Sequence, residues 1–347
     1  QCWAYFARSL AMTRSFDIAV IGATGSVGET LVQLLEERDF PVANLHLIAS
    51  GDSAGGSLSF KGKNLRVRSL ESFDFANVRL AFFTAGAAVT LEYAAQARAA
   101  GCAVIDLTGA LPQEQAPRVI PEVNAEVLAT LAAPYLLASP SAPSIALASV
   151  LAVLGAHLSP QRLTVTACLA VSSRGRAGVS ELARQTAELL NGRAFEPQLF
   201  DRQMAFNLLG QVDECDGEGH GALERRMALE LKTLLAAPQL QVSATCIQAP
   251  VFFGDSFSVS LQCASAFDLQ ALRDALEAAP AVEYVESGDY PTVVGDAVGQ
   301  DEVYVGRVRA GLDDPCELNL WIASDNVRKG AALNAVQLAE LLIKHYL

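Results

Sequence analysis

Three serines lie at a turn where a helix is expected to begin, and their hydroxyl groups are candidate nucleophiles. Ser139, Ser141 and Ser144 lie between an apolar run over 135–138 and an apolar segment over 145–158. A serine hydroxyl can attack a carbonyl carbon when an adjacent base removes its proton. None of the histidines, at 46, 157, 220 and 345, is obviously directed at the turn. We therefore expect the serines to cap the helix that begins near Ile145, since serine is a favoured capping residue.

A second group of residues has the spacing of a phosphate-binding turn. GATGSVG, at 22–28, follows a β-branched run over 16–21 and precedes an amphipathic segment over 28–38. Glycines let a backbone approach a pyrophosphate, and the following helix presents its N-terminus to the negative charge. The turn predicts a dinucleotide site, although glycines that serve folding alone would give the same pattern. The residues expected to line the site are Gly22, Thr24, Gly25, Ser26 and Val27.

Asp52 lies where a side chain can discriminate between NAD and NADP. It follows the second expected strand, 24 positions after Gly28. An acid there accepts a hydrogen bond from the ribose 2′-hydroxyl of NAD and repels the 2′-phosphate of NADP. We expect NAD or NADP as cofactor, with NAD favoured. The alternative is that Asp52 is a solvated loop acid.

The elements that must position these residues change in character along the chain. Strand-like runs at 16–21, 45–50, 78–86 and 102–107 alternate with helical segments at 28–38 and 89–101, which indicates βαβ units and a mostly parallel sheet. After residue 160, longer strand-like runs indicate a mixed sheet in an α+β domain. These runs cover 163–173, 245–263, 302–310 and 316–324, and helical segments cover 179–190, 222–235, 268–279 and 330–347.

The fold expected from this pattern is α/β with two domains. A Rossmann-type dinucleotide-binding domain covers 12–138, and a C-terminal helix over 326–347 packs back on it. The α+β domain covers 139–325. Met12 is the expected start, and residues 1–11 stay outside the fold prediction.

Composition excludes several classes of protein. The chain has 25 basic and 38 acidic residues, a net charge of −13. Such a chain repels phosphate backbones and anionic membranes, so nucleic-acid and membrane partners are not expected. Seven cysteines without a C-x-x-C pair favour reduced thiols in a cytoplasmic protein. We expect no metal site, and the acidic stretch over 213–220 is interpreted as a solvated loop.

Several segments together resemble a known family, the aspartate-β-semialdehyde dehydrogenases. They are GATGSVG (22–28), FFTAG (82–86), VIPEVN (119–124), AFN (205–207), VGRVR (305–309) and DNVRKGAALNAVQLAELL (325–342). The resemblance implies a homodimer formed through the second domain. It also implies NADP-dependent interconversion of β-aspartyl phosphate and aspartate semialdehyde, through a cysteine thioester and a histidine acid/base. It adds Ser50, Ala85, Gly86 and Asn326 to the expected cofactor residues.

The chain departs from the family's pattern where the chemistry should occur. The resemblance places Ala142 at the nucleophilic cysteine and Asp255 at the histidine. It places Leu169 at the glutamine that orients the intermediate, Gln248 at a substrate arginine and Leu111-Pro112 at a second arginine. An alanine methyl cannot form a thioester, and an aspartate of ordinary pKa is a poor acid near pH 7. The pattern resembles the family's Usg-like members, which keep the scaffold without the cysteine.

Three functions remain open at this point. The chain could be a catalytically inactive, dinucleotide-binding or scaffold homodimer, which we expect. It could instead be an oxidoreductase that acts on an uncharged substrate without a covalent intermediate, or a regulatory or assembly subunit. Glu224 and Arg226 align with a family pair that faces the substrate, so some anion affinity is expected there. Arg174 and Arg176 either bind another anion or only occupy a loop.

Overall fold

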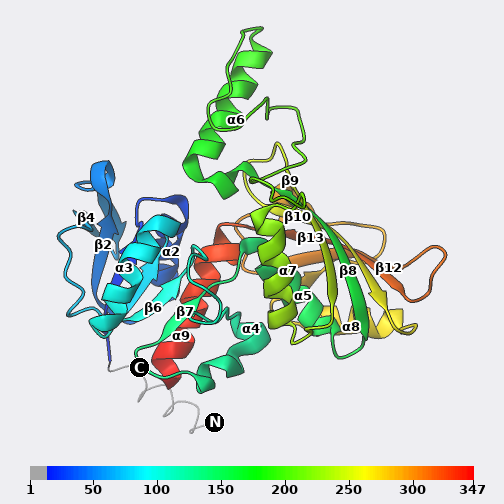
Figure 1. Cartoon of the computed structure of the whole chain (residues 1–347), viewed down its shortest axis with the longest axis horizontal. Helices are drawn as coiled ribbons and strands as arrows, with labels where there is room; N and C mark the ends of the chain where they lie inside the picture. Colours follow the sequence, from blue (N-terminus) through cyan, green and yellow to red (C-terminus); the bar gives the residue numbers. More distant parts are fainter. Residues whose placement is uncertain (1–13) are drawn as a thin grey trace. The chain divides into compact units, whose positions relative to one another are not determined.

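The computed structural model describes residues 14–347, which form two compact units (Figure 1). The first unit runs through Pro140 and also includes Ala331–Leu347, and the second is Ser141–Gly330. The expected start at Met12 lies outside the described residues.

The first unit is built on a seven-stranded sheet in the order β3-β4-β2-β1-β5-β6-β7. Every neighbouring pair is parallel except β3 and β4. The strands are β1 (Phe16–Ile21), β2 (Val42–Ala49), β3 (Ser57–Phe60), β4 (Lys63–Ser69), β5 (Leu80–Phe83), β6 (Ala103–Asp106) and β7 (Leu136–Ala138). The helices are α2 (Ser26–Glu37), α3 (Ala87–Ala99), the short α4 (Pro121–Asn124) and α9 (Asn334–His345). The Rossmann-type prediction is confirmed, and the strand order changes direction between β1 and β5.

The sequence prediction missed the antiparallel hairpin formed by β3 and β4. Phe60 pairs with Lys63, and the two residues between them, Lys61 and Gly62, have φ angles of 47° and 73°. Positive φ at both central residues is the signature of a type I′ turn, whose twist matches that of the strands. Lysine is not a usual residue in this conformation, so the residues of the turn indicated the hairpin only weakly.

Helix α9 completes the core of the first unit although it comes last in the sequence. Val336, Leu338 and Leu342 of α9 are fully buried in the same hydrophobic cluster as Ile18 of β1 and Leu31 of α2. The expected single helix over 330–347 is wrong in its first part, because Arg328–Leu333 is π-helical and the α-helix begins only at Asn334.

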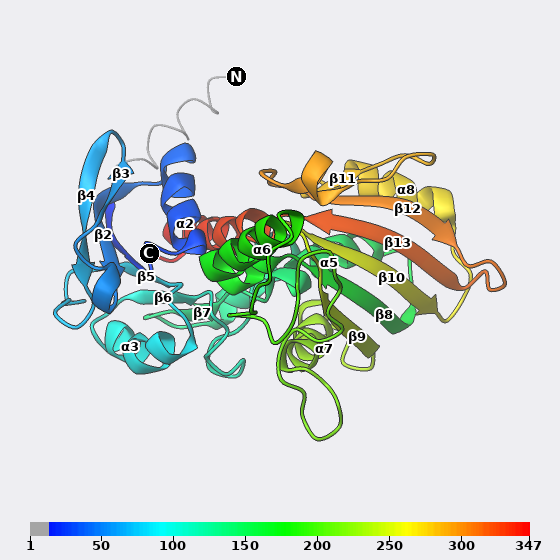
Figure 2. The ribbon, with the colours of Figure 1, turned by 90° about the horizontal axis from the view of Figure 1, so that it is seen from above.

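The second unit is built on a six-stranded mixed sheet in the order β11-β12-β13-β10-β8-β9, whose longer strands lie side by side in Figure 2. The strands are β8 (Pro160–Leu169), β9 (Gln241–Gln248), β10 (Asp255–Cys263), β11 (Val282–Tyr284), β12 (Val303–Ala310) and β13 (Glu317–Ser324). The helices are α5 (Ala142–Leu154), α6 (Gly175–Leu190), α7 (Ala222–Leu234) and α8 (Leu269–Ala278). The expected mixed sheet is confirmed, but the run over 245–263 is two strands, separated at Pro250 and at Gly254 with φ of 91°.

Side chains alternate strictly along β8 and β10. Leu163, Val165 and Ala167 of β8 are buried, whereas Thr164 is exposed and Thr166 is half-buried. Strand β10 repeats this pattern: its apolar residues are buried, and its serines are half-buried or exposed. Helices α5, α7 and α8 contact this sheet, so its buried residues form the core beneath them.

Gly28 permits the tight packing of the first turn of α2, and its replacement tests this packing. A Cβ at residue 28 would lie 2.1 Å from the carbonyl oxygen of Gly22. We expect Gly28→Ala to lower the free energy of unfolding by about 1–3 kcal/mol, because backbone must move to admit the methyl group. Urea denaturation measures this change.

Gly56→Ala is the matched control, since a Cβ there meets nothing within 4 Å. We expect it to change stability by less than about 0.5 kcal/mol. Equal effects of the two substitutions would contradict the packing explanation.

Candidate functional site

The glycine-rich turn joins β1 to α2 and is fixed by the neighbouring strands. The N–H of Gly22 donates to the carbonyl of Ile48 at 2.8 Å, and the hydroxyl of Thr84 donates to the carbonyls of Ile21 and Gly22 at 2.9 and 3.1 Å. Gly22 has φ of 91°, and a Cβ there would lie 2.5 Å from the Thr84 hydroxyl. Folding of the turn therefore requires Gly22.

Gly25 and Gly86 are exposed and less confined: a Cβ at Gly25 would lie no closer than 3.4 Å to another atom, the carbonyl oxygen of Gly22. Gly25 is exposed at the N-cap of α2, and Gly86, with φ of 111°, would place a Cβ where no atom lies within 4 Å. Bare backbone of this kind lets a pyrophosphate approach the N-terminus of a helix. The described residues of the turn thus fit a dinucleotide.

The expected cofactor residues of the first unit lie together at the carboxyl ends of three strands of its sheet. The Gly22–Val27 turn follows β1, Ser50 follows β2, and Ala85 and Gly86 follow β5. These three strands are parallel neighbours, and the strand order reverses between β1 and β5. Ligands of open α/β sheets bind outside the carboxyl ends of strands at such a reversal. Asp52 lies in the 3₁₀ turn Gly51–Ser53 at the same edge.

The serine turn differs from its prediction. Ser141 is the N-cap residue of α5, which begins at Ala142 and not near Ile145, and its side chain makes no capping hydrogen bond. Its hydroxyl lies 2.7 Å from Oε2 of Glu230 and 2.9 Å from the hydroxyl of Ser144. The backbone N–H of Ser141 donates to the same Glu230 oxygen at 3.0 Å. Ser139 belongs to the first unit, where its hydroxyl accepts a hydrogen bond from Asn334 at 2.9 Å.

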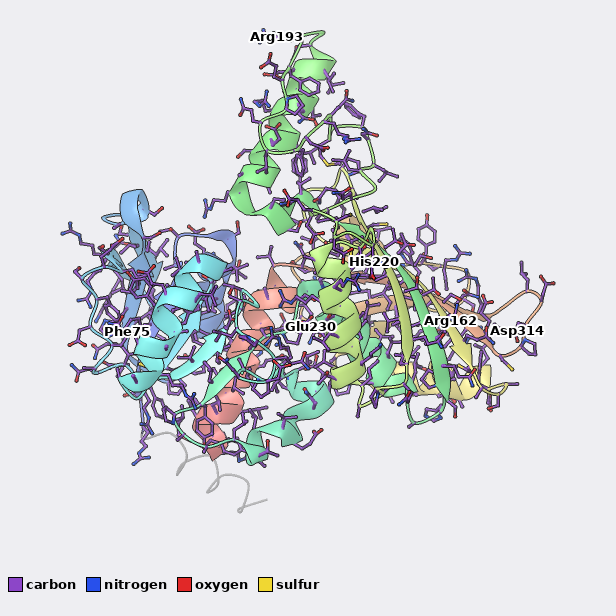
Figure 3. All side chains as sticks on the ribbon, in the orientation of Figure 1. Phe75, Arg162, Arg193, His220, Glu230 and Asp314 are labelled. Atoms are coloured by element: carbon purple, nitrogen blue, oxygen red, sulfur yellow. The ribbon has the colours of Figure 1, made fainter. Side chains whose placement is uncertain are left out.

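Glu230 holds the turn, and the sequence analysis missed it. It projects from α7 and is labelled in Figure 3. Its carboxylate is 1% exposed and accepts a 2.7 Å hydrogen bond from Nε of Arg226, one helical turn away. The i, i+4 spacing of Arg226 and Glu230 was the available signal. This ion pair directs the Arg226 guanidinium toward Glu230 and weakens the expectation of anion binding.

Ala142 occupies a confined position at the start of α5. A Cβ added to Gly330 would lie 2.7 Å from the Cβ of Ala142, so the alanine methyl packs against bare backbone. An alanine side chain offers neither a nucleophile nor a proton.

Three other residues of the expected substrate site lie in one row across the sheet. Leu169 at the end of β8 pairs with Gln248 of β9, and Asp255 of β10 pairs with Ser324 of β13. All of these belong to the buried face. Ser324, which the sequence analysis missed, is 2% exposed, and its hydroxyl has no hydrogen-bond partner within residues 14–347.

Asp255 does not have the ordinary pKa that the sequence analysis assumed. Burial raises the pKa of its carboxyl from 3.8 to about 7; a hydrogen bond from the N–H of Ala170 opposes this, and the charge of Asp325 adds to it. The side chain is 2% exposed. Loss of charge on burial costs less than keeping a desolvated carboxylate ionised. A group with this pKa can donate or accept a proton near neutral pH.

Gln248 presents a hydrogen-bond acceptor where the resemblance implies an arginine. Its Nε2 donates to the carbonyl of Leu169 at 2.7 Å, and its Oε1 is buried without a partner in the described chain. Gln248 lines a cavity of about 900 Å³, together with Arg174, Asn207 and Gln211. Arg174 donates to the carbonyl of Val212 at the wall of this cavity.

Glu224 and Asn326 are engaged within the second unit. Glu224 accepts hydrogen bonds from the N–H groups of Gly221 and Cys246, both at 2.9 Å. Asn326 accepts from the N–H of Gly254 at 2.9 Å, and its Nδ2 donates to Ser172 at 2.9 Å. Both side chains thus hold backbone segments in place.

Leu111 and Pro112 lie near a buried arginine that the sequence analysis also missed. Arg118 is 6% exposed and donates to the carbonyls of Leu111 and Ala116 at 2.8 and 2.9 Å. The N–H of Leu111 donates to Asp106 at 3.1 Å. Because Arg118 is bonded to main-chain oxygens, it supports the loop.

The acidic stretch over 213–220 contains ion pairs. Asp216 lies 2.6 Å from Arg225, which also contacts Glu218. The described residues contain no group of three or more His, Cys, Asp or Glu side chains that could hold a metal ion. Over the same residues, no helix combines the length and apolar character needed to cross a membrane.

Comparison with known proteins identifies the family. The semialdehyde dehydrogenase NAD-binding domain matches residues 17–131, and the semialdehyde dehydrogenase dimerisation domain matches residues 151–329. The chain is 40% identical over 336 residues to aspartate-semialdehyde dehydrogenase 2 of Vibrio cholerae, with 96% of this chain and 100% of that enzyme covered. The chain belongs to the aspartate-semialdehyde dehydrogenase family. The resemblance stated from the sequence is confirmed.

Other members of the aspartate-semialdehyde dehydrogenase family are more similar. The USG-1 protein homolog of Azotobacter vinelandii is 62% identical over 333 residues, with 96% of this chain and 99% of the relative covered. A solved structure described as a probable aspartate-semialdehyde dehydrogenase from Pseudomonas aeruginosa has a TM-score of 0.94 at 61% identity, covering 96% of this chain and all of that one.

The raised pKa of Asp255 makes the stability of this aspartate-semialdehyde dehydrogenase family member depend on pH. The pKa in the folded chain lies above the ordinary value, so the contribution of Asp255 to stability is fully present below pH 3.8 and is lost as the pH rises through about 7. Between pH 4 and pH 8, we expect the free energy of unfolding to fall by about 4 kcal/mol more in the wild type than in Asp255→Asn. Urea denaturation across this range measures the difference.

Asp313→Asn is the control, because Asp313 is exposed on a loop. The free energy of unfolding of Asp313→Asn should depend on pH in the same way as that of the wild type. Parallel pH curves for the wild type and Asp255→Asn would show that the buried carboxyl does not titrate in this range.

Proposed function

We propose that this protein is a dinucleotide-binding homodimer of the aspartate-semialdehyde dehydrogenase family that does not carry out the thioester chemistry of the family reaction. Ala142, at the expected nucleophile position, carries this proposal. A thioester needs a sulfur that attacks the substrate carbonyl, and a methyl group has no lone pair to do so. The hydroxyl of Ser141 lies against Glu230 within the turn instead.

Binding of the dinucleotide is supported by the glycine turn and by the exposed backbone at Gly25 and Gly86. NAD is the favoured ligand, because a carboxylate at residue 52 suits a ribose hydroxyl and repels a phosphate. When bound, the nicotinamide would supply hydride chemistry. The chain's own residues would hold the pyrophosphate by backbone N–H groups of the turn. The match to a dimerisation domain over residues 151–329 supports the homodimer.

Two measurements test this function. In the assay with aspartate semialdehyde, phosphate and either dinucleotide, we expect no turnover and no acylated protein in the mass spectrum. In calorimetry, we expect NAD to bind more tightly than NADP, and Asp52→Arg to reverse this order because a guanidinium pairs with the 2′-phosphate.

A family enzyme that contains the cysteine is the positive control for turnover, and Gly28→Ala is the negative control for binding. Trapping of an acyl-protein would refute the absence of thioester chemistry. If neither dinucleotide binds at millimolar concentration, the proposed dinucleotide binding is refuted, and a scaffold is the only part of the proposed function that stands.

A second function is favoured by the buried row that contains Gln248, Asp255 and Ser324. This row combines an acid/base of pKa about 7 with two unpartnered polar atoms, Oε1 of Gln248 and Oγ of Ser324. Gln248 offers a carbonyl oxygen and no positive charge, so the row suits an uncharged substrate that donates hydrogen bonds. We propose as the alternative a reductase of uncharged carbonyl compounds that also carry a hydrogen-bond donor. A bound nicotinamide would supply hydride chemistry, and Asp255 would donate the proton to the carbonyl oxygen.

A panel of uncharged aldehydes and ketones with NADH and NADPH tests this alternative. We expect any turnover to fall roughly 10²–10⁴-fold in Asp255→Asn and its rate to follow a group of pKa about 7. Asp313→Asn should retain the wild-type rate. Turnover that is unaffected by Asp255→Asn would exclude this role for the residue.

A further inference from the structure

Two cysteines lie opposite each other on neighbouring strands of the second unit. Cys263 is the last residue of β10, and Cys316 immediately precedes β13. The register of these antiparallel strands pairs Gln262 with Glu317, so the next position pairs Cys263 with Cys316. The N–H of Cys263 donates to the carbonyl of Cys316 at 2.9 Å, which agrees with this pairing. Both residues are in the thiol form.

The side chains of the two cysteines lie on the same face of the sheet. Directly opposite residues of an antiparallel pair point to the same side, and the nearest pair on that side is Leu261 with Leu318. The Cα atoms of a hydrogen-bonded pair of this kind are about 5.5 Å apart. A disulfide joins residues whose Cα atoms are about 4.4–6.8 Å apart. The register thus allows a disulfide between Cys263 and Cys316 without movement of the strands.

A second pair of cysteines on neighbouring strands does not share this geometry. In the register of β8 and β9, Cys168 pairs with Ile247, and Cys246 pairs with Ala167. Because the two cysteines are offset by one residue, their side chains point to opposite faces of the sheet. Cys246 is accordingly buried and Cys168 is half-buried. This pair serves as an internal comparison in which proximity along the sheet does not bring the thiols together.

Asp314 holds the segment that carries Cys316 in place. Its Oδ1 accepts a hydrogen bond from the N–H of Cys316 at 2.8 Å, and its Oδ2 accepts one from Nε2 of Gln262 at 2.9 Å. Asp314 lies in the loop between β12 and β13 and is labelled in Figure 3. The carboxylate therefore joins the loop to the residue next to Cys263. A segment that is already ordered loses less conformational entropy when a bond forms within it.

Cys316 is the more accessible of the two thiols. It is half-buried and follows the exposed Pro315, whereas Cys263 is 3% exposed. Burial raises the pKa of the Cys263 thiol, and the neighbouring Cys316 adds to this increase. The Sγ of Cys263 lies 3.9 Å from the carbonyl oxygen of Leu261, and a thiol is a weak donor, so little is lost when it turns away. Cys316 is thus the thiol that an oxidant meets first.

We propose that Cys263 and Cys316 form a redox modification site, at which a low-molecular-weight disulfide converts the two thiols into one cross-strand disulfide. The thiolate of Cys316 attacks one sulfur of the small disulfide, which forms a mixed disulfide and releases a small thiolate. Cys263 then loses its proton and attacks Sγ of Cys316, and the second small thiolate leaves. The two protons of the cysteines pass to these thiolates. Two protein thiols are oxidised, and one small disulfide is reduced to two thiols.

The new bond would tie together the two ends of a long segment. Residues 264–315, between the two cysteines, contain α8, β11 and β12. A cross-link that closes a long loop restricts the unfolded chain more than the folded chain. We therefore expect the disulfide to stabilise the protein under oxidising conditions, and a small dithiol to reverse the effect.

Oxidation of the folded full chain with glutathione disulfide at about pH 8.5 tests the proposal. In the wild type, peptides prepared without reduction should contain a link between Cys263 and Cys316, and dithiothreitol should remove it. The midpoint temperature of unfolding should rise by roughly 5 °C on oxidation, and that of Cys316→Ser should not change. Cys215→Ser is the matched control, because Cys215 is exposed on a loop; this variant should retain the link.

The order of the two steps is tested with Cys263→Ala. We expect glutathione to remain on Cys316 in this variant, because the second thiol is missing; this variant also serves if Cys316→Ser does not fold. The proposal is overturned if glutathione remains on Cys316 in the wild type, or if Cys316 stays unmodified while Cys215 reacts. A link between Cys168 and Cys246 in its place would also overturn it.

Discussion

The alternation of side chains along β8 and β10 is the constraint on which the second unit depends. Because successive residues of a strand point to opposite faces, each strand must satisfy two environments at once. Leu169 and Asp255 belong to the buried face, and their immediate neighbours Cys168 and Ser256 lie half-buried on the opposite face. A shift of one residue in register would place hydroxyls in the core and leucines in solvent. The buried row of the candidate site therefore depends on the register of strands whose other face carries small polar side chains.

The chemistry that this chain retains follows from burial more than from residue type. The three serines of the turn are possible nucleophiles by residue type, but the carboxylate of Glu230 binds Ser141 through both its hydroxyl and its N–H. An aspartate appears unsuitable as an acid, but desolvation moves the pKa of Asp255 close to neutrality. The chain thus has an alanine at the expected nucleophile position in α5 and, on β10, a buried carboxyl group whose pKa is raised to about 7.

The sequence predicted those features that local patterns determine. Hydrophobic runs and the GATGSVG turn gave the first sheet, its dinucleotide edge and the mixed second sheet. The β3–β4 hairpin was missed because its turn uses Lys61, and the start of α5 was misplaced because the serines had been assigned to capping. The raised pKa of Asp255 could not be predicted, since it depends on atoms brought together from β8, β10 and the segment at Asp325. Glu230 was missed for the same reason, because its partner Ser141 lies 89 residues away in the sequence.

The position of α9 has a consequence for the synthesis of the protein. The strands and helices of the first unit leave the ribosome early, but their cluster around Ile18 and Leu31 is closed by Val336, Leu338 and Leu342, which are made after the whole second unit. The apolar surface that α9 covers stays open while the whole second unit is translated. Domains that are completed late expose such surface to aggregation and to chaperones. A chain that terminated before Asn334 would contain every strand of the first unit but lack α9, so the loss of a late segment would open the part of the protein that was made first.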